Sequence, residues 1–326
     1  MDIQFDIPES VMRCDILDYL EVGLVDGIYE PPIALDTLAK ASKANSIHGS
    51  ALSAKRNMIA SSTRFLDGSI KRRDYKRFID DCLVFGNGYL LKVTNLLGGV
   101  TYKHLPALYM RRKKSLTEYC YKPRRDNDEG RIDYKPGQVF HYAEYDVCQE
   151  IYGLPQYIGA LPSIWLNEEA TLFRRKYYIN GSHAGYILYL NDPTLSDTQV
   201  EEISKKLKKT GGLGAFKNIF INAKGKDGKK PELIPIGQID AKDAFKDIKN
   251  QTTNDILTVH RIPLELMSVV REGLSSSGDL NKVDRIFYKN ELAPYIESVV
   301  DELNAFADKE IIAVKEYEGL ETPKVA

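Results

Sequence analysis

The feature that most constrains the fold is a pair of long predicted helices that bracket a small α/β segment. Residues 154–181 carry apolar side chains at three- and four-residue steps, which is the spacing of a helix with one buried side. Pro162 lies within this segment and should kink the helix or divide it in two. A second helix is predicted over 240–260, before Pro263. The segment between them predicts a β-α-β-β order with a lysine-rich helix, and its strands are expected at 186–190, 218–222 and 232–236.

The chain outside this helix pair is predicted to mix helices with strands, so the expected fold class is α+β. Helices are expected at 37–44, 50–65 and 71–85. Strands are expected at 89–94, 100–105 and 138–142. A final helix should start at Asp279 and kink at Pro294.

The composition fits a folded protein rather than a disordered or membrane-spanning chain. The 326 residues are 43% hydrophobic and 28% charged. No stretch reaches the roughly 18 to 20 apolar residues of a transmembrane helix. The acidic start of the sequence lacks the apolar core of a signal peptide, so synthesis in the cytoplasm is expected. The four cysteines lie far apart without a C-x-x-C pair and are expected to be reduced thiols.

The net charge of −1 hides a strong segregation of charge along the chain. Residues 1–30 contain eight acids and one base, and residues 291–326 contain nine acids and three bases. By contrast, residues 111–125 contain seven bases and one acid, and residues 201–230 contain nine bases and three acids. This pattern indicates either self-assembly or a partner that meets one charged surface. A protein that coats DNA usually has a net basic excess, so extensive DNA binding is not expected.

Motifs of catalysis are weak in this sequence. The glycine-rich segment 211–217 lacks the spacing of a phosphate-binding loop. The oxygen-rich turn 126–129 has no second group of carboxylates nearby to complete a cation site. The five histidines lack metal-ligand spacing, and the serines at 275–277 lack the context of a hydrolase nucleophile. We therefore expect neither an enzyme nor a bound cofactor or metal.

Several long segments carry a recognisable pattern in a fixed order. They are His48–Leu52, Lys55–Asn57, Val84–Tyr89, Leu105–Arg112, Gln149–Pro155, Asn167–Gly185, His260–Pro263 and Asn290–Pro294. Together they resemble the portal proteins of tailed bacteriophages, specifically the PBSX-type family of contractile-tailed temperate phages. The resemblance extends from about residue 15 to residue 305.

The resemblance implies a structural role in the virion. Portal proteins of this kind form a ring of about a dozen identical subunits at one capsid vertex. Double-stranded DNA passes through the ring without sequence specificity during packaging and ejection. The expected partners are further copies of the chain, the terminase, the major capsid and scaffolding proteins, and later the head–tail connector or adaptor. No membrane partner is expected, and the protein would be made in the host cytoplasm.

The resemblance also implies a division of the chain into named regions. The sequence departs from the family in one respect, because little follows the final helix, so we expect the crown to be absent or reduced to residues 305–326. The expected regions are the wing at 1–150, stem helix one at 151–183, the clip at 184–236, stem helix two at 237–263, the tunnel loop at 264–279, and a wing helix with a short C-terminal tail at 280–326. A near-neutral chain agrees with a channel through which DNA must slide, because phosphate binding strengthens steeply with each neutralised charge.

The functional residues that the resemblance suggests fall into three groups. For the tunnel loop facing DNA they are Arg271, Glu272, Ser275, Ser276 and Ser277. For the clip surface facing the terminase they are Lys205, Lys206, Lys208 and Lys209. For the stem they are Arg174, Arg175 and Lys176, which would face a neighbouring subunit or DNA. A solvated basic surface is the alternative for the lysines and for the stem residues, and a connecting loop without a role is the alternative for 264–279.

Two further functions stay open at this point. A structural tail or adaptor protein would be equally non-enzymatic, and a phage nuclease would need clustered carboxylates for metal ions. The helix pair around an insert favours the portal. We also expect ring assembly because the predicted first stem helix has few partners within its own hairpin for four apolar side chains. These are Leu154, Ile158, Leu161 and Trp165.

Overall fold

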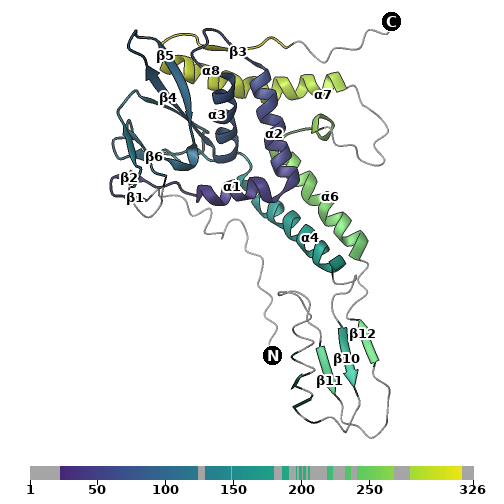
Figure 1. The fold of residues 1–326 in the computed structure, drawn as a ribbon. Helices are drawn as coiled ribbons and strands as arrows, with labels where there is room; N and C mark the ends of the chain where they lie inside the picture. The colour runs from purple at the N-terminus through teal and green to yellow at the C-terminus, as the bar shows by residue number, and fades with distance from the viewer. Residues whose placement is uncertain are drawn as a thin grey trace. The chain divides into compact units, whose positions relative to one another are not determined.

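The computed structural model describes two units of the chain (Figure 1). The larger unit combines Met1–Trp165 with Thr253–Ala326, and the smaller unit is Leu166–Thr252. The described residues are 23–123, 129–147, 149–179, 186–190, 196, 198–199, 201–202, 205, 219–222, 232–235, 241–267 and 280–317. The smaller unit is therefore an insertion in the larger one.

After two short strands, the first part of the larger unit contains three helices: α1 (Leu35–Ala44), α2 (Ser46–Ser61) and α3 (Arg72–Phe85). The end of α3 was predicted correctly, because Gly86 adopts the left-handed conformation (φ 71°) that terminates helices. The predicted helix 50–65 is wrong at both ends. It begins at Ser46, and Thr63–Phe65 forms strand β3, which pairs antiparallel with β13 (Ile312–Val314).

A three-stranded antiparallel sheet lies at the centre of the larger unit, in the order β5-β4-β9. Its strands are β5 (Val100–Leu105), β4 (Asn87–Thr94) and β9 (Val139–Ala143), close to their predicted positions. A second sheet has the order β1-β2-β6-β7-β8. Its strands are Leu24–Val25, Ile28–Tyr29, Met110–Lys113, Tyr119–Tyr121 and Ile132–Tyr134.

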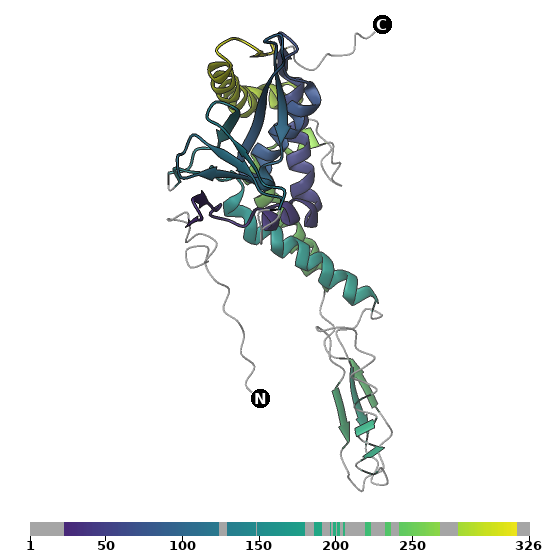
Figure 2. The same cartoon turned by 60° about the vertical axis from the view of Figure 1, so that its left-hand side comes forward.

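One face of the central sheet is covered by α3 and by the later helix α8 (Ala293–Ala307). Phe78 of α3 packs against Phe140 and Tyr142 of β9, with ring centroids 5.9 and 6.5 Å apart. Tyr142 also contacts Tyr295 of α8 at 6.0 Å. The sheet and the helices that cover it are seen together in Figure 2. Gly88 of β4 faces α3, where a side chain would collide with Phe78. The core of the larger unit therefore lies between this sheet and these two helices.

The last helical stretch is interrupted, as predicted. Helix α7 (Leu280–Phe287) leads into a π-helical turn (Tyr288–Leu292) and then into α8. Pro294 lies in the first turn of α8, where its missing N–H is tolerated, so the irregular backbone precedes it.

Two long helices run from one unit into the other: α4 (Leu161–Ile179) and α6 (Ala241–His260). The start of α4 differs from the predicted 154, because Pro162 stands in its first turn rather than in its interior. Leu154 and Leu161 are buried in the core of the larger unit. Ile158 and Trp165 pack against the same core. The expectation that a single subunit leaves these side chains only partly covered is therefore wrong for Leu154 and Leu161, while Ile158 and Trp165 are half-buried.

The smaller unit contains the predicted insert. Strands β10 (Tyr186–Leu190), β11 (Ile219–Asn222) and β12 (Glu232–Pro235) form a sheet in the order β11-β10-β12. β10 pairs parallel with β11 and antiparallel with β12. The parallel pair needs a crossover connection, and helical residues are described within it at 198–199, 201–202 and 205. Where α4 and α6 continue into this unit, Asn167 Nδ2 donates to Thr252 Oγ1 at 2.7 Å.

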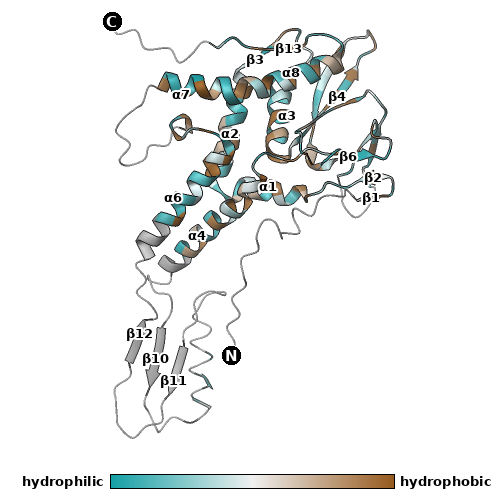
Figure 3. Cartoon of the chain, turned by 180° about the vertical axis from the view of Figure 1, so that it is seen from behind, coloured by the Kyte–Doolittle hydropathy of each residue, from teal (hydrophilic) through white to brown (hydrophobic). Residues whose placement is uncertain are grey.

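The helices mix hydrophilic and hydrophobic stretches (Figure 3). Within the described residues, no helix combines the length and the apolar character needed to cross a bilayer.

Candidate functional site: a buried polar cluster at the base of α4 and α6

Two histidines from distant parts of the chain meet in the interior of the larger unit. His48 lies in the first turn of α2, and His260 is the last residue of α6. His48 Nδ1 and His260 Nε2 are 2.8 Å apart, so one ring donates a hydrogen bond to the other. Both side chains are buried, and the ring of Tyr157 packs against both.

Burial keeps this histidine pair neutral. Desolvation lowers the pKa of His48 from 6.5 to about 4. The pKa of His260 falls to about 3, first through desolvation and then through the nearby charges of His48 and Lys55. Both rings are therefore uncharged at neutral pH.

The start of α2 is fixed by Asn45, which also reaches α4. Its Oδ1 accepts hydrogen bonds from the backbone N–H groups of Ile47 and His48, each at 3.0 Å. This is a helix N-cap, and it explains why α2 begins at Ser46. Its Nδ2 donates to the carbonyl of Ile164 in α4 at 3.1 Å. One side chain thus positions His48 and ties the first turns of α4 to α2.

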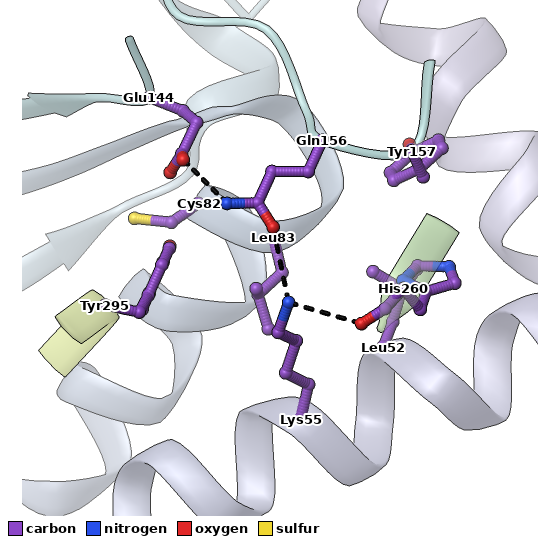
Figure 4. Close-up of a pocket in the computed structure, with 9 residues that line it drawn as sticks. All are labelled: Leu52, Lys55, Cys82, Leu83, Glu144, Gln156, Tyr157, His260 and Tyr295. Atoms are coloured by element: carbon purple, nitrogen blue, oxygen red, sulfur yellow. Dashed lines mark hydrogen bonds between the residues drawn. The ribbon is translucent and has the colours of Figure 1, made fainter. Parts of the chain in front are cut away.

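Lys55 is a buried cation in the same cluster, with 3% of its surface exposed. Its Nζ donates to Gln156 Oε1 at 3.3 Å and to the carbonyl of His260 at 3.5 Å (Figure 4). That carbonyl belongs to the C-terminal end of α6, where the helix dipole favours a positive charge. Burial lowers the pKa of Lys55, while the carboxylates of Glu291 and Glu144 oppose this change.

A chain of side chains continues from Lys55 towards the sheet. Gln156 Nε2 donates to Glu144 Oε1 at 2.7 Å, so Gln156 links the ammonium of Lys55 to that carboxylate. These residues surround a small cavity of about 10 Å³, which is the space of roughly one water molecule. Tyr295 also lines it, and its hydroxyl has no hydrogen-bond partner within the described residues (Figure 4).

A second group of hydrogen bonds holds the segment that leads into α4. Asn87 of β4 donates through Nδ2 to the carbonyls of Gly153 and Phe85, at 2.7 and 2.9 Å. Its Oδ1 accepts from the N–H of Gly153 at 2.8 Å and lies 3.0 Å from His141 Nε2. The Tyr157 hydroxyl donates to the carbonyl of Val84 at 2.7 Å. The segment before α4 is thereby held against the end of α3 and the start of β4.

The chemistry of this arrangement is that of a structural joint. Its histidines are neutral and buried, and its one cation contacts neutral acceptors. Burial raises the pKa values of the Cys82 and Cys120 thiols, which makes them poor nucleophiles. In the part of the chain that the structure describes, no group of three or more His, Cys, Asp or Glu side chains could hold a metal ion.

The cluster differs from the functional residues that we expected from the sequence. Its members were not singled out because a histidine pair 212 residues apart leaves no local pattern. The available signal was that His48, Lys55 and His260 all fall in the segments that carry the resemblance.

Of the predicted site residues, the structure describes the side chains of Lys205, Arg174 and Arg175. The tunnel-loop residues Arg271, Glu272, Ser275, Ser276 and Ser277 lie outside the described residues, as do Lys206, Lys208 and Lys209. Lys205 is exposed and lies 3.7 Å from Glu201. In α4, Arg174 is half-buried and Arg175 is exposed, while the side chain of Lys176 is not described.

Comparison with known proteins gives one consistent result. A family profile described as "Phage portal protein" matches residues 75–314. The chain is 41% identical to a "Probable portal protein" of Escherichia phage P2, over 96% of this chain and 90% of the relative. It is 32% identical to a "Probable portal protein" of Haemophilus phage HP1, over 93% and 89%.

Solved structures extend this result to the fold. A chain from the virion of a native gene transfer agent particle has a TM-score of 0.62 at 16% identity, covering 92% of this chain and 87% of that one. A chain from the neck of the native particle, computed with C12 symmetry, has a TM-score of 0.63 at 16% identity, covering 91% and 87%.

Proposed function

This chain belongs to the phage portal protein family, and from that premise we propose that identical copies close into a ring around the DNA channel at one capsid vertex. Portal proteins are components of the virion, and the family is structural rather than enzymatic. The observation that carries the proposal is the identity with a phage P2 protein over almost the full length of the chain. The similar chain in the gene transfer agent neck, which was computed with C12 symmetry, supports a ring of twelve subunits. The PBSX-type subfamily stays a prediction.

Electron microscopy and mass spectrometry can test whether the protein forms a ring. The purified protein should form closed rings with a central hole in negative-stain images. Native mass spectrometry should give a whole-number multiple of the subunit mass of 36.9 kDa. A species of the subunit mass alone, across micromolar concentrations and with capsid and scaffolding proteins present, would contradict the ring.

We assign the regions of the chain by the same premise. In this assignment 1–150 is the wing, α4 and α6 are the stem helices, 184–236 is the clip and 264–279 is the tunnel loop. The buried cluster supports the stem assignment, because it anchors the ends of both helices in the larger unit. Long helices that surround a channel need such an anchor if they are to keep their direction while DNA moves.

The clip would receive the terminase and later the head–tail connector. The lysine-rich sequence of this region supports the proposal, and Lys205 is exposed. A variant in which Lys205, Lys206, Lys208 and Lys209 become glutamine should keep the ring and lose terminase binding, measured by co-sedimentation. Unchanged binding would leave these lysines as a solvated surface.

The tunnel loop would narrow the channel around DNA. Deletion of 272–278 should leave ring assembly intact and impair packaging or retention of the genome. Rings that package and hold genome-length DNA normally would make the loop a connector only.

We expect no nuclease activity, and a DNA cleavage assay tests this. Purified protein incubated with DNA and Mg²⁺ or Mn²⁺ should give no cleavage above background. Cleavage that co-purifies with the protein and is lost in an Asp126→Asn/Asp128→Asn variant would favour the nuclease alternative.

A further inference from the structure

The first two turns of α3 carry an exposed basic surface, here called the basic face. Of its five basic residues, four are exposed and Lys76 is half-buried. The four exposed residues are Lys71, Arg72, Arg73 and Arg77. Arg72 donates to the carbonyl of Ala60 and lies over the Phe65 ring. Among the described residues none of the five forms an ion pair within the chain.

The position of the basic face is unfavourable for the isolated subunit. The N-terminal end of a helix carries a partial positive charge, so cations in the first turn reduce helix stability. The exposed cations also repel one another. A negatively charged partner would relieve both effects, so the face is better suited to a contact than to solvent.

A second helix of the same unit carries the opposite charge. The exposed side of α8 presents Glu297, Asp301 and Glu302, here called the acidic face. Glu297 and Asp301 are one helical turn apart, and like charges at this spacing destabilise a helix. The pKa of Glu302 is raised, first by partial burial and then by the charge of Glu144. Within the described part of the chain these three carboxylates form no ion pair.

The two faces belong to one rigid core but do not meet within it. Helices α3 and α8 both pack on the central sheet, through Phe78 and Tyr295 respectively. Their exposed sides point away from that sheet, since their apolar sides are buried against it. One subunit therefore offers two unpaired surfaces of opposite charge in a fixed geometry.

We propose that the basic face of α3 docks against the acidic face of α8 on a second copy of this chain. This inference rests on the ring of the proposed function. A contact between two different surfaces of identical subunits is heterologous, and its repetition forms a ring when the rotation between neighbouring subunits closes a full circle. Charge complementarity also fixes how neighbouring subunits align, because two basic faces or two acidic faces would repel each other.

Charge reversal tests the contact. The basic-face variant is Lys71→Glu/Arg73→Glu/Arg77→Glu, in which three new carboxylates outnumber the two remaining cations. The acidic-face variant is Glu297→Lys/Asp301→Lys, in which two new ammonium groups outnumber the one remaining carboxylate. Each variant alone would place like charges against each other in every contact. We expect ring formation by native mass spectrometry to require at least about 100-fold more protein, or to fail. Circular dichroism verifies that each variant is folded.

Mixing the two variants gives the decisive result. The basic-face variant then presents two acidic faces, and the acidic-face variant presents two basic faces. An equimolar mixture should restore rings in which the two variants alternate, with equal numbers of each in the mass spectrum. A single chain with all five substitutions should also form rings. A matched control, Lys103→Glu/Lys114→Glu/Lys135→Glu, reverses three exposed lysines elsewhere in the larger unit and should assemble like the wild type.

Each other outcome would overturn the inference. Variants that assemble normally alone would show that the two faces do not meet. Variants that fail alone and are not rescued by mixing would show the same. A basic-face variant that assembles but loses binding to a 30-base-pair DNA duplex would assign that face to nucleic acid. A wild-type protein that forms no ring would instead contradict the proposed function, so the two failures are distinguishable.

Discussion

Helices α4 and α6 make different hydrogen bonds in the two units. Their base lies in the larger unit, and they continue into the smaller one. At the base, Asn45, Lys55 and His48 connect the helices to α2 through buried hydrogen bonds. In the smaller unit, Asn167 and Thr252 connect α4 and α6 to each other. The hydrogen bonds at the base attach the helix pair to the rest of the larger unit, whereas the bond in the smaller unit holds the two helices together. Substitutions at the base should therefore cost more stability than substitutions in the continuation.

The largest effect is expected at Asn87. Asn87→Leu removes an amide whose two ends contact Gly153, Phe85 and His141, and it leaves buried polar groups unpaired. The free energy of unfolding of the larger unit should fall by about 3–5 kcal/mol, measured by urea denaturation. Asn57→Leu, at an exposed position of α2, is the control and should change it by less than about 0.5 kcal/mol.

The next effect is a dependence on pH. The native state holds His48 and His260 neutral, with pKa values of about 4 and 3, whereas unfolding restores an ordinary value near 6.5. Below pH 6.5 the unfolded state binds more protons, so stability falls as pH drops from 6.5 towards 4. For one histidine the loss over this range is on the order of 3 kcal/mol.

The variant His48→Gln separates this effect from that of other titrating groups. It should be less stable at pH 7 and show a shallower slope of stability between pH 6.5 and 4. Equal slopes in the two proteins would contradict a neutral native histidine pair.

Asparagine-to-alanine substitutions in the two regions should differ in cost. Asn45→Ala removes an N-cap and a hydrogen bond to α4, so it should cost about 2 kcal/mol. Asn167→Ala removes the bond to Thr252 and should cost about 1 kcal/mol. Hydrogen exchange should show faster exchange in the first turns of α2 and α4 for the first variant. For the second it should be confined to residues near 167 and 252. Equal, global acceleration in both would mean that the two regions do not open separately.

The smallest effect is expected in the insert. Lys205→Gln breaks an exposed ion pair with Glu201, whose side chains are 75% and 74% exposed. Such pairs contribute little, so thermal denaturation should shift by no more than the equivalent of about 0.5 kcal/mol. A larger loss would show that Lys205 has a structural role.

Local patterns in the sequence predicted most elements but not the cluster. The ends of α3 and α6 and the strands of the insert follow from glycine, proline and β-branched residues that act within a few positions. The start of α4 was misplaced because the apolar spacing begins at Leu154, in a largely buried segment that ends in a short 3-10 turn (Ile158–Ala160) and is not part of the α-helix. Lys55 could not be predicted as buried, since a charged residue is ordinarily exposed and only its contacts across the fold explain its position.

The discontinuous larger unit has a consequence for how the protein is made. Strand β3 finds its partner β13, and His48 finds His260, only after the whole insertion has left the ribosome. Contacts of such sequence separation slow folding, and the N-terminal portion waits with part of its core uncovered. Subunits still in synthesis therefore lack both a closed core and helix α8. Under the proposed contact between subunits, a chain that stops before α8 lacks the acidic face, so we expect truncated products to be left out of the ring.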